Sequence, residues 1–299
     1  MGALLLVRYG ELALKSPPVR REFERSLRRN ILAQLLRDGV TGRLRADRGH
    51  LYVESDDPER ALRVLRRVFG VTSVSEAHEV PTDRAAIRAR LLELAGPRLS
   101  HGASFAVRAR RTGQHPFTSQ QLAAELGEAV LESFADRALT VDLEHPDVEL
   151  HVEVRANRTY LYFDRAPGPG GLPLGVAGRL VALVDGRRGA LGAFLMMKRG
   201  CRVSLVVLPD AEPLVDGTLA RFDPAVHVLP SPPDVESWSS AVATEAERSH
   251  ADGVVLPIGV DDYAAAKARW GDRVLFSPTV GLSDEEVSER WRNVTALAG

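Results

Sequence analysis

Short apolar runs with strand-like spacing alternate with longer stretches of helical spacing along the first 77 residues of this chain. The pattern predicts a strand at 4–9, a helix at 19–37, strands at 42–46 and 50–55, a helix at 58–68 and a strand at 71–77. Pro58 suits the first turn of the second helix, where its missing N–H costs nothing. This order of elements is typical of a split βαβ, ferredoxin-like domain.

The middle of the chain shows a second mixed pattern. It predicts a helix at 84–94, a strand at 104–109, a helix at 119–134 and strands around 150–154 and 159–163. Thr118 stands where the third helix begins, and its hydroxyl is expected to cap that helix. The segment is therefore a second α/β domain.

From residue 180 onward, short apolar strands and helices alternate regularly. Residues 167–178 are rich in Pro and Gly and are predicted to be a linker. Alternation of this kind favours a parallel sheet with helices on both faces. Ligands of such sheets bind at the carboxyl ends of the strands. The first turn, Val184 to Gly189, is therefore where a nucleotide phosphate would meet a helix N-terminus.

Composition and charge narrow the class of protein. The net charge is -1, but the first 166 residues carry 26 Lys and Arg against 23 Asp and Glu. No apolar run approaches the roughly 20 residues of a membrane span, and the N-terminus reads as a strand rather than a signal peptide. A cytoplasmic location and no membrane partner are expected. The single cysteine, Cys201, excludes an internal disulfide and a multi-cysteine zinc site.

Several spaced motifs in a fixed order resemble the tRNA 4-thiouridine synthetases, also called tRNA sulfurtransferases. The opening of that family resembles Val7 to Ser16, and its RNA-binding THUMP module resembles the segments Phe105 to Arg111, Phe117 to Ser119, Val141 to Leu150, Val152 to Arg155 and Tyr160 to Phe163. The resemblance implies a multidomain α/β and α+β fold. Its parts are a ferredoxin-like domain at 1–77, a THUMP domain at 78–166, a linker at 167–178 and a Rossmann-like, PP-loop ATPase-like domain with a parallel sheet at 179–299.

The family resemblance also implies that the first two domains bind the acceptor end of a tRNA. The candidate RNA-binding residues are Arg8, Lys15, Arg20, Arg108, Arg110, Arg111 and Phe117. Arginine contacts phosphates through two N–H groups, and an aromatic ring can stack on an unpaired base. Two alternatives stay open: the arginines could be charges that protect an edge strand, and Phe117 could belong to the core.

The predicted nucleotide loop departs from the family pattern. There the turn reads Ser-Gly-Gly-any-Asp-Ser, whereas residues 184–189 here keep only Gly186. Both hydroxyls are gone and Arg188 stands at the aspartate position. Gly186, Arg187 and Arg188 are the remaining nucleotide-binding candidates, and no catalytic or metal-binding residue is assigned.

Two hypotheses follow. In the first, the chain is a tRNA-binding protein without ATP-dependent adenylation and without a cofactor. In the alternative, it is an active tRNA sulfurtransferase that uses ATP and Mg²⁺ through an altered loop and takes sulfur from a donor protein. An active homologue and a second copy of the chain are further partners to consider. Because basic residues are enriched before residue 166, a fragment ending at about Asp164 is expected to keep most of the tRNA affinity.

Overall fold

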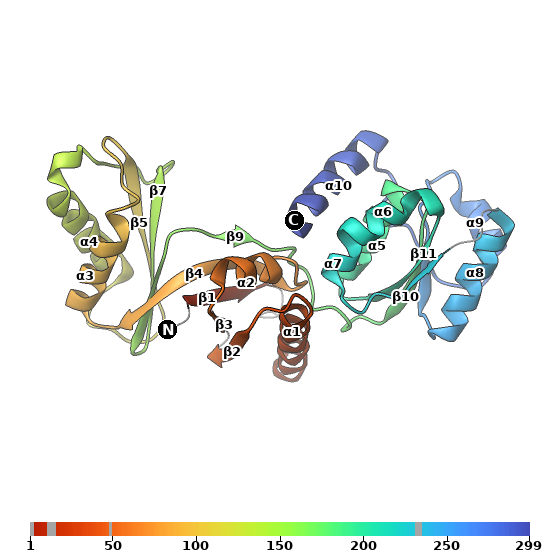
Figure 1. The fold of residues 1–299 in the computed structure, drawn as a ribbon, viewed down its shortest axis with the longest axis horizontal. Helices are drawn as coiled ribbons and strands as arrows, with labels where there is room; N and C mark the ends of the chain where they lie inside the picture. The colour runs from red at the N-terminus through yellow and green to blue at the C-terminus, as the bar shows by residue number, and fades with distance from the viewer. Residues whose placement is uncertain (1–2, 11–15, 48–49, 231–234) are drawn as a thin grey trace. The chain divides into compact units, whose positions relative to one another are not determined.

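The computed structural model describes residues 3–10, 16–47, 50–230 and 235–299, which form two compact units (Figure 1). Unit 1 comprises Met1–Leu6, Tyr52–Pro58 and Ser75–Ala166. Unit 2 comprises Val7–Leu51, Glu59–Val74 and Pro167–Gly299.

The ferredoxin-like order predicted for the N-terminal segment is confirmed. Its elements are β1 (Ala3–Tyr9), α1 (Pro17–Arg37), β2 (Gly42–Asp47), β3 (His50–Ser55), α2 (Pro58–Leu65) and β4 (Val71–Pro81). The strands lie in the order β2-β3-β1-β4. Helix α1 begins with proline after Ser16. The helical spacing of Phe23, Leu27, Ile31 and Leu35 predicts a buried stripe, of which the last three are buried and Phe23 is partly buried.

Unit 1 contains a sheet in the order β4-β8-β7-β5-β6. Its elements are α3 (Arg84–Ala95), β5 (Ser104–Arg111), α4 (Ser119–Ser133), a 3₁₀ turn (Ala135–Arg137), β6 (Thr140–Val141), β7 (Val148–Arg155) and β8 (Arg158–Tyr162). Helices α3 and α4 cover one face of this sheet (Figure 1). As predicted, Thr118 caps α4, in a capping box with Gln121.

Unit 2 contains a five-stranded parallel sheet in the order β12-β11-β10-β13-β14, as the alternation of elements predicts. After β9 (Ala166–Pro167), its main elements are β10 (Arg179–Val184), α5 (Arg187–Lys198), β11 (Arg202–Val207), β12 (Val228–Pro230), α8 (Val235–Arg248), β13 (Gly253–Val255), α9 (Tyr263–Trp270), β14 (Leu275–Phe276) and α10 (Asp284–Ala298). Helices α5 and α10 cover one face of the sheet and α8 and α9 the other (Figure 1).

A series of short helical turns connects β11 to β12. It consists of a 3₁₀ turn (Pro209–Ala211), α6 (Glu212–Leu214), a π-helical turn (Val215–Leu219) and α7 (Ala220–Phe222). The sequence pattern predicted no element here. The segment buries Ala211, Val215, Leu219 and Phe222, and so completes the core on the α5 side.

The core of unit 2 also includes residues from the N-terminal part of the chain. Phe69 is 1% exposed, and its ring centroid lies 5.3 Å from that of Phe194 and 5.5 Å from that of Phe222. The side-chain amide of Gln34, on α1, donates hydrogen bonds to the carbonyls of Arg221 (3.1 Å) and Phe222 (2.8 Å). The N-terminal part of the chain thus meets the C-terminal segment through apolar contacts of Phe69 and hydrogen bonds from α1.

Candidate nucleic-acid interface and nucleotide loop

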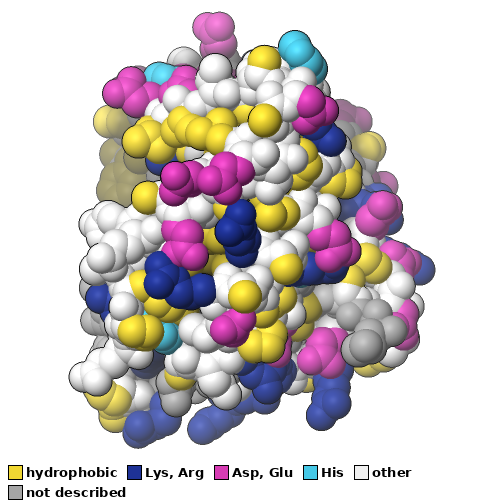
Figure 2. Space-filling view, turned by 90° about the vertical axis from the view of Figure 1, so that its left-hand side faces the viewer, with side chains coloured by type: hydrophobic (Ala, Val, Ile, Leu, Met, Phe, Trp, Pro, Cys, Tyr) yellow, Lys and Arg dark blue, Asp and Glu magenta, His cyan; other side chains and the backbone are white. Residues whose placement is uncertain are grey.

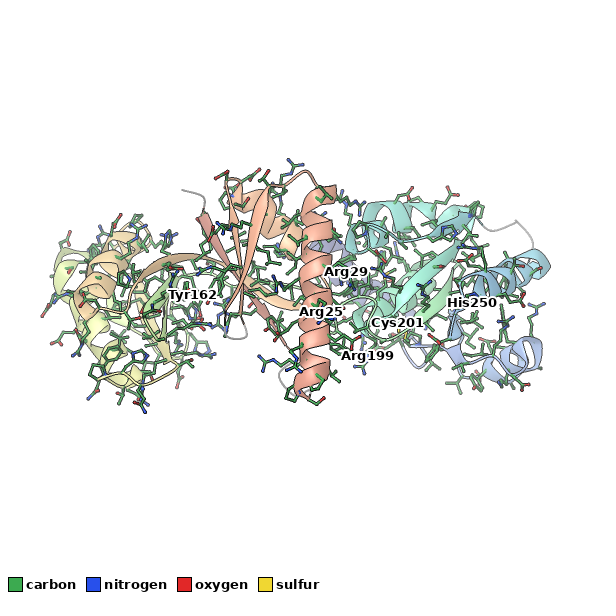
Figure 3. The ribbon with its side chains drawn as sticks, turned by 90° about the horizontal axis from the view of Figure 1, so that it is seen from below. Arg25, Arg29, Tyr162, Arg199, Cys201 and His250 are labelled. Carbon is green, nitrogen blue, oxygen red and sulfur yellow. The ribbon has the colours of Figure 1, made fainter. Side chains whose placement is uncertain are left out.

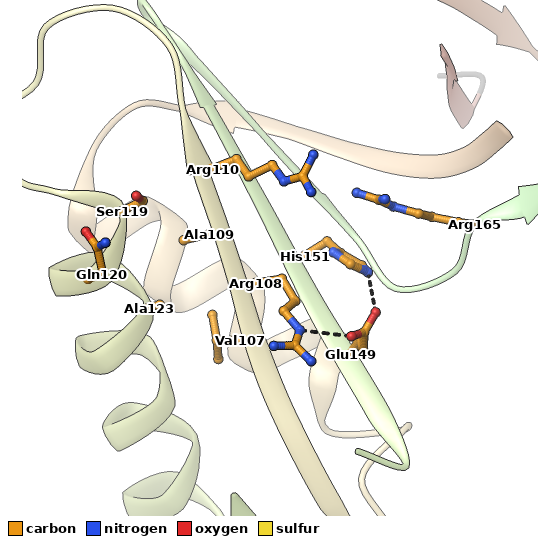
Figure 4. Close-up of a pocket in the computed structure, with 10 residues that line it drawn as sticks. All are labelled: Val107, Arg108, Ala109, Arg110, Ser119, Gln120, Ala123, Glu149, His151 and Arg165. Atoms are coloured by element: carbon orange, nitrogen blue, oxygen red, sulfur yellow. Dashed lines mark hydrogen bonds and ion pairs between the residues drawn. The ribbon is translucent and has the colours of Figure 1, made fainter. Parts of the chain in front are cut away.

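A hollow of about 410 Å³ lies along the outer edge of β5 in unit 1 (Figure 4). Strand β6 pairs with β5 at Ser104 and Phe105, before the hollow begins. Side chains alternate along a strand, so Phe105 and its neighbours on that side face the helices, while Arg108 and Arg110 face away from them. The hollow is lined by Val107, Arg108, Ala109, Arg110, Ser119, Gln120, Ala123, Glu149, His151 and Arg165.

Arg108 is held by neighbours within unit 1. Its Nε donates to Glu149 Oε1 at 2.9 Å, and its Nη2 donates to the carbonyl of Leu143 at 2.7 Å. The other Glu149 oxygen lies 3.1 Å from Nε2 of His151 (Figure 4). The hydrogen bond from Arg108 is the largest influence that lowers the pKa of Glu149 below its usual value. Much of the Arg108 charge is therefore neutralised.

Arg110 lies in a different environment two residues further along β5. Its side chain is exposed, and among the described residues no carboxylate lies within ion-pair distance of it. Figure 4 shows its guanidinium pointing toward that of Arg165 above His151. Arg165 donates to the hydroxyl of Tyr162 at 3.0 Å, and the ring of Tyr162 stacks on His151 at a centroid distance of 4.7 Å. Two converging guanidinium groups favour an anion between them.

The remaining candidates in unit 1 have local roles. Arg111 donates to the carbonyl of Gly113 at 3.1 Å. Phe117 is 6% exposed and belongs to the core under α3 and α4, where its ring stacks on His115 at 5.6 Å. The core role left open for Phe117 is the one observed, and its ring does not face solvent where a base could stack.

The candidates in the N-terminal part of unit 2 are dispersed. Arg8 is half-buried in β1, and Arg20 on α1 pairs with Glu24 at 2.9 Å. Lys15 lies outside the described residues. Arg25 and Arg29 are exposed on α1 and are labelled in Figure 3.

The helical face of unit 1 carries charges of both signs. Figure 2 views the molecule from the side of α3 and α4, and shows basic side chains beside acidic ones near the middle of this surface. Between the two helices, Arg84 pairs with Glu125 and Arg88 with Glu132. This face therefore lacks the cationic excess of the Arg110 hollow.

The loop after β10 places a carboxylate at the N-terminus of α5. The backbone N–H of Gly189 donates to Asp185, and a Cβ built on Gly189 would lie 2.9 Å from Asp185 Oδ1 and 2.6 Å from the carbonyl oxygen of Leu183. Only glycine fits there. Loss of hydration raises the pKa of Asp185 above its ordinary value, against the opposing effect of the loop N–H groups and Arg188. The carboxylate occupies N–H donors that an anionic ligand would otherwise use.

Arg188 is turned toward the segment between β14 and α10. It donates to the carbonyls of Thr279 and Leu282, both at 2.9 Å, and pairs with Asp284 at 2.8 Å. Gly186 is the N-cap residue of α5, without a side chain to cap it, and Arg187 is exposed. A hollow of about 670 Å³ beside the loop is also lined by Asp210 and Asp284. Acidic side chains thus share the space with the two arginines.

The part of the chain that the structure describes offers a buried thiol and no cluster of metal ligands. Cys201, labelled in Figure 3, is 4% exposed, and burial is the main cause that raises the pKa of its thiol. Its Sγ lies 3.4 Å from the carbonyl of Ala177. No group of three or more His, Cys, Asp or Glu side chains among the described residues could hold a metal ion. No described helix is long and apolar enough to span a membrane.

Comparisons with known proteins identify the domains. A family model described as the ThiI ferredoxin-like domain matches residues 4–75, and one for the THUMP domain matches residues 82–164. A probable tRNA sulfurtransferase of Methanothermobacter thermautotrophicus is 39% identical over 214 residues, which cover 70% of this chain and 53% of the relative. The chain thus spans about half the length of this relative.

Two solved structures share the fold. PH1313 from Pyrococcus horikoshii is 27% identical with a TM-score of 0.81, over 97% of this chain and 99% of its own. A 4-thiouridine synthetase, solved in complex with RNA and bound ATP, is 21% identical with a TM-score of 0.77, over 100% of this chain and 86% of its own. The two domain matches and the 39% identity to the sulfurtransferase of Methanothermobacter thermautotrophicus place the chain in the tRNA sulfurtransferase family.

Proposed function

We propose that this chain is a tRNA-binding protein that does not adenylate its RNA. The observation that carries RNA binding is the convergence of Arg110 and Arg165 on one hollow at the edge of the THUMP sheet. Phosphate contacts of this kind position an RNA without reading its sequence. The RNA complex of the related 4-thiouridine synthetase supports tRNA as the partner.

The proposal that adenylation is absent depends on the loop after β10. ATP transfer needs N–H donors and Mg²⁺ held in place around the phosphates. Here the Asp185 carboxylate accepts a hydrogen bond from a loop N–H, and Arg188 donates hydrogen bonds to carbonyls of the neighbouring turn. These side chains do not fit a nucleoside triphosphate with bound Mg²⁺, because its phosphates would approach the carboxylates of Asp185 and Asp284.

Substitution of Arg110 tests the RNA site. Arg110→Ala should weaken tRNA binding and reduce the slope of log K against log salt by about 0.7 to 0.9, because one phosphate contact is lost. Arg88→Ala is the matched control, since Arg88 pairs with Glu132 at 3.3 Å on the helical face. Titrations of both variants across a salt series decide the question. Equal losses for both would indicate that total charge alone binds the RNA.

Calorimetry tests the loop. ATP with Mg²⁺ should give no saturable binding in the micromolar range, so the binding free energy should be weaker than about -8 kcal/mol. The exposed Arg187 is the observation that favours the alternative enzyme. Tight ATP binding that Arg187→Gln abolishes, with thiolated uridine formed from tRNA, ATP-Mg²⁺ and sulfide, would establish a working sulfurtransferase instead.

A further inference from the structure

A second cationic hollow lies in unit 2, at the edge of the parallel sheet opposite the loop at 184–189. It measures about 340 Å³ and is bounded by the first residues of β10 and β11, the segment 223–227 and the end of α8. Arg179 and Arg202 are in-register partners on the two adjacent strands. This is the amino-terminal edge of the sheet, whereas the loop at 184–189 follows the carboxyl end of β10.

The two carboxylates at this hollow are buried beneath it and already have donors. Asp223 is 3% exposed at its side chain; it accepts hydrogen bonds from Arg202 at 3.2 Å and from the backbone N–H of Ala225 at 3.0 Å. The Glu245 side chain is fully buried and accepts two hydrogen bonds from Arg248, at 2.6 and 2.8 Å. Although burial acts to raise the pKa of Glu245, its bonds with Arg248 and Ser204 hold that pKa below the usual value. Both groups therefore remain internal acceptors.

The groups that face solvent around the hollow are cationic or neutral donors. The exposed side-chain fractions are 38% for Arg202, 50% for His227 and 58% for Arg248, and Arg179 is also exposed. Among the described residues, no carboxylate lies within ion-pair distance of the Arg179 guanidinium. Arg202 and Arg248 are paired with the two buried carboxylates, so the Arg179 guanidinium is the positive charge in excess. Because like charges on adjacent strands repel, this excess favours a bound counter-anion.

We propose that this hollow is a phosphate-binding site, with Arg179 as its principal donor and Arg202, His227 and Arg248 at its wall. Planar guanidinium groups donate in pairs to phosphate oxygens, which makes phosphate a better match than a halide. A free phosphate compound and a phosphodiester of RNA carry the same recognised group. The site is independent of the Arg110 hollow, so it can be tested whether or not that hollow binds tRNA.

The test uses the full chain and inorganic phosphate, followed by ³¹P NMR and calorimetry. Arg179→Gln is the informative variant, because the hydrogen bonds between this residue and Asp252 use its backbone N–H and carbonyl, which the substitution leaves in place. It should weaken phosphate binding at least tenfold. Arg292→Gln, an exposed arginine on α10, is the matched control and should leave binding unchanged. Arg187→Gln, in the loop after β10, should also leave phosphate binding unchanged, and so distinguishes the hollow from that loop.

Two further arms identify the source of the phosphate. If phosphate competes with tRNA, and Arg179→Gln weakens both phosphate binding and tRNA binding, the bound phosphate group belongs to RNA. If Arg179→Gln leaves tRNA binding unaltered, the ligand is a free phosphate compound. Either result supports the site. Absence of saturable phosphate binding by the unmodified chain overturns it. So does an equal loss in Arg179→Gln and Arg292→Gln, or a loss confined to Arg187→Gln.

Discussion

Arg108 and Arg110 show how one residue type takes two roles within a single strand. Both face the same side of β5, yet Arg108 is tied to Glu149 and Leu143 while Arg110 is exposed. The sequence identifies the basic edge strand correctly. It does not reveal Glu149 as the partner of Arg108, because β7 lies beside β5 only after the domain has folded. Arg165 was missed for the same reason, since it lies beyond the strand that carries the motif.

Glu149 is expected to restrain RNA binding. Replacement by Gln removes its negative charge and frees Arg108 for a phosphate. Glu149→Gln should therefore strengthen tRNA binding and steepen the slope of log K against log salt by about 0.7 to 0.9, the value for one phosphate contact. Glu128→Gln, on the exposed side of α4, makes the same charge change away from the hollow. Binding titrations at several salt concentrations compare the two. Similar gains in both variants would show a general charge effect rather than release of Arg108.

The same residue pair predicts a pH dependence. The pKa of Glu149 is lowered in the folded protein, chiefly by the hydrogen bond from Arg108. The pair therefore stabilises the fold above the unfolded carboxyl pKa of about 4.3, and this contribution disappears as pH falls through the lower folded value. Melting temperatures measured from pH 6 to pH 3 should fall less steeply for Glu149→Gln than for the unmodified protein. Parallel curves would contradict the assignment.

At the scale of elements, the sequence predicts what depends on local spacing and caps. Helices α1 and α4 and the parallel sheet of unit 2 agree with the pattern, because apolar periodicity and end signals lie within each segment. The turns at 209–222 were missed, since Pro213 and Gly217 interrupt any regular helix and packing against α5 decides their shape. The bonding of Arg188 to the turn at 279–284 depends equally on distant chain segments.

Arg188 is expected to fasten α5 to the turn before α10. Its side chain is 23% exposed and donates to two carbonyls and one carboxylate. Arg188→Ala should lower the free energy of unfolding by about 1 to 3 kcal/mol, because the buried carbonyl of Thr279 and the partly buried carbonyl of Leu282 lose a charged donor. Arg187→Ala, next to it and exposed, should have almost no effect. Urea unfolding of both variants measures the difference, and equal stability would exclude this role.

At the scale of the whole molecule, the domains named from sequence share cores that their boundaries do not reveal. Unit 2 joins α1 and α2 to the parallel sheet through Phe69, Gln34 and the residues around Phe222. A fragment ending at about Asp164 would leave Phe69 exposed and the Gln34 amide without its acceptors. We now expect such a fragment to unfold more readily, so reduced tRNA affinity in it would report lost structure rather than a lost RNA contact.

Phe222→Ala in the full chain tests this shared core directly. The ring is 2% exposed and lies 5.1 Å from Phe194 and 5.5 Å from Phe69, so its removal should cost about 3 to 5 kcal/mol. Hydrogen exchange should accelerate in α1 as well as in β10 and β11, because both depend on the same packing. Phe105→Ala, in the core of unit 1, is the matched control and should accelerate exchange in β5 and β7 while leaving α1 protected. Unchanged exchange in α1 of Phe222→Ala would mean that α1 is held independently of the C-terminal segment.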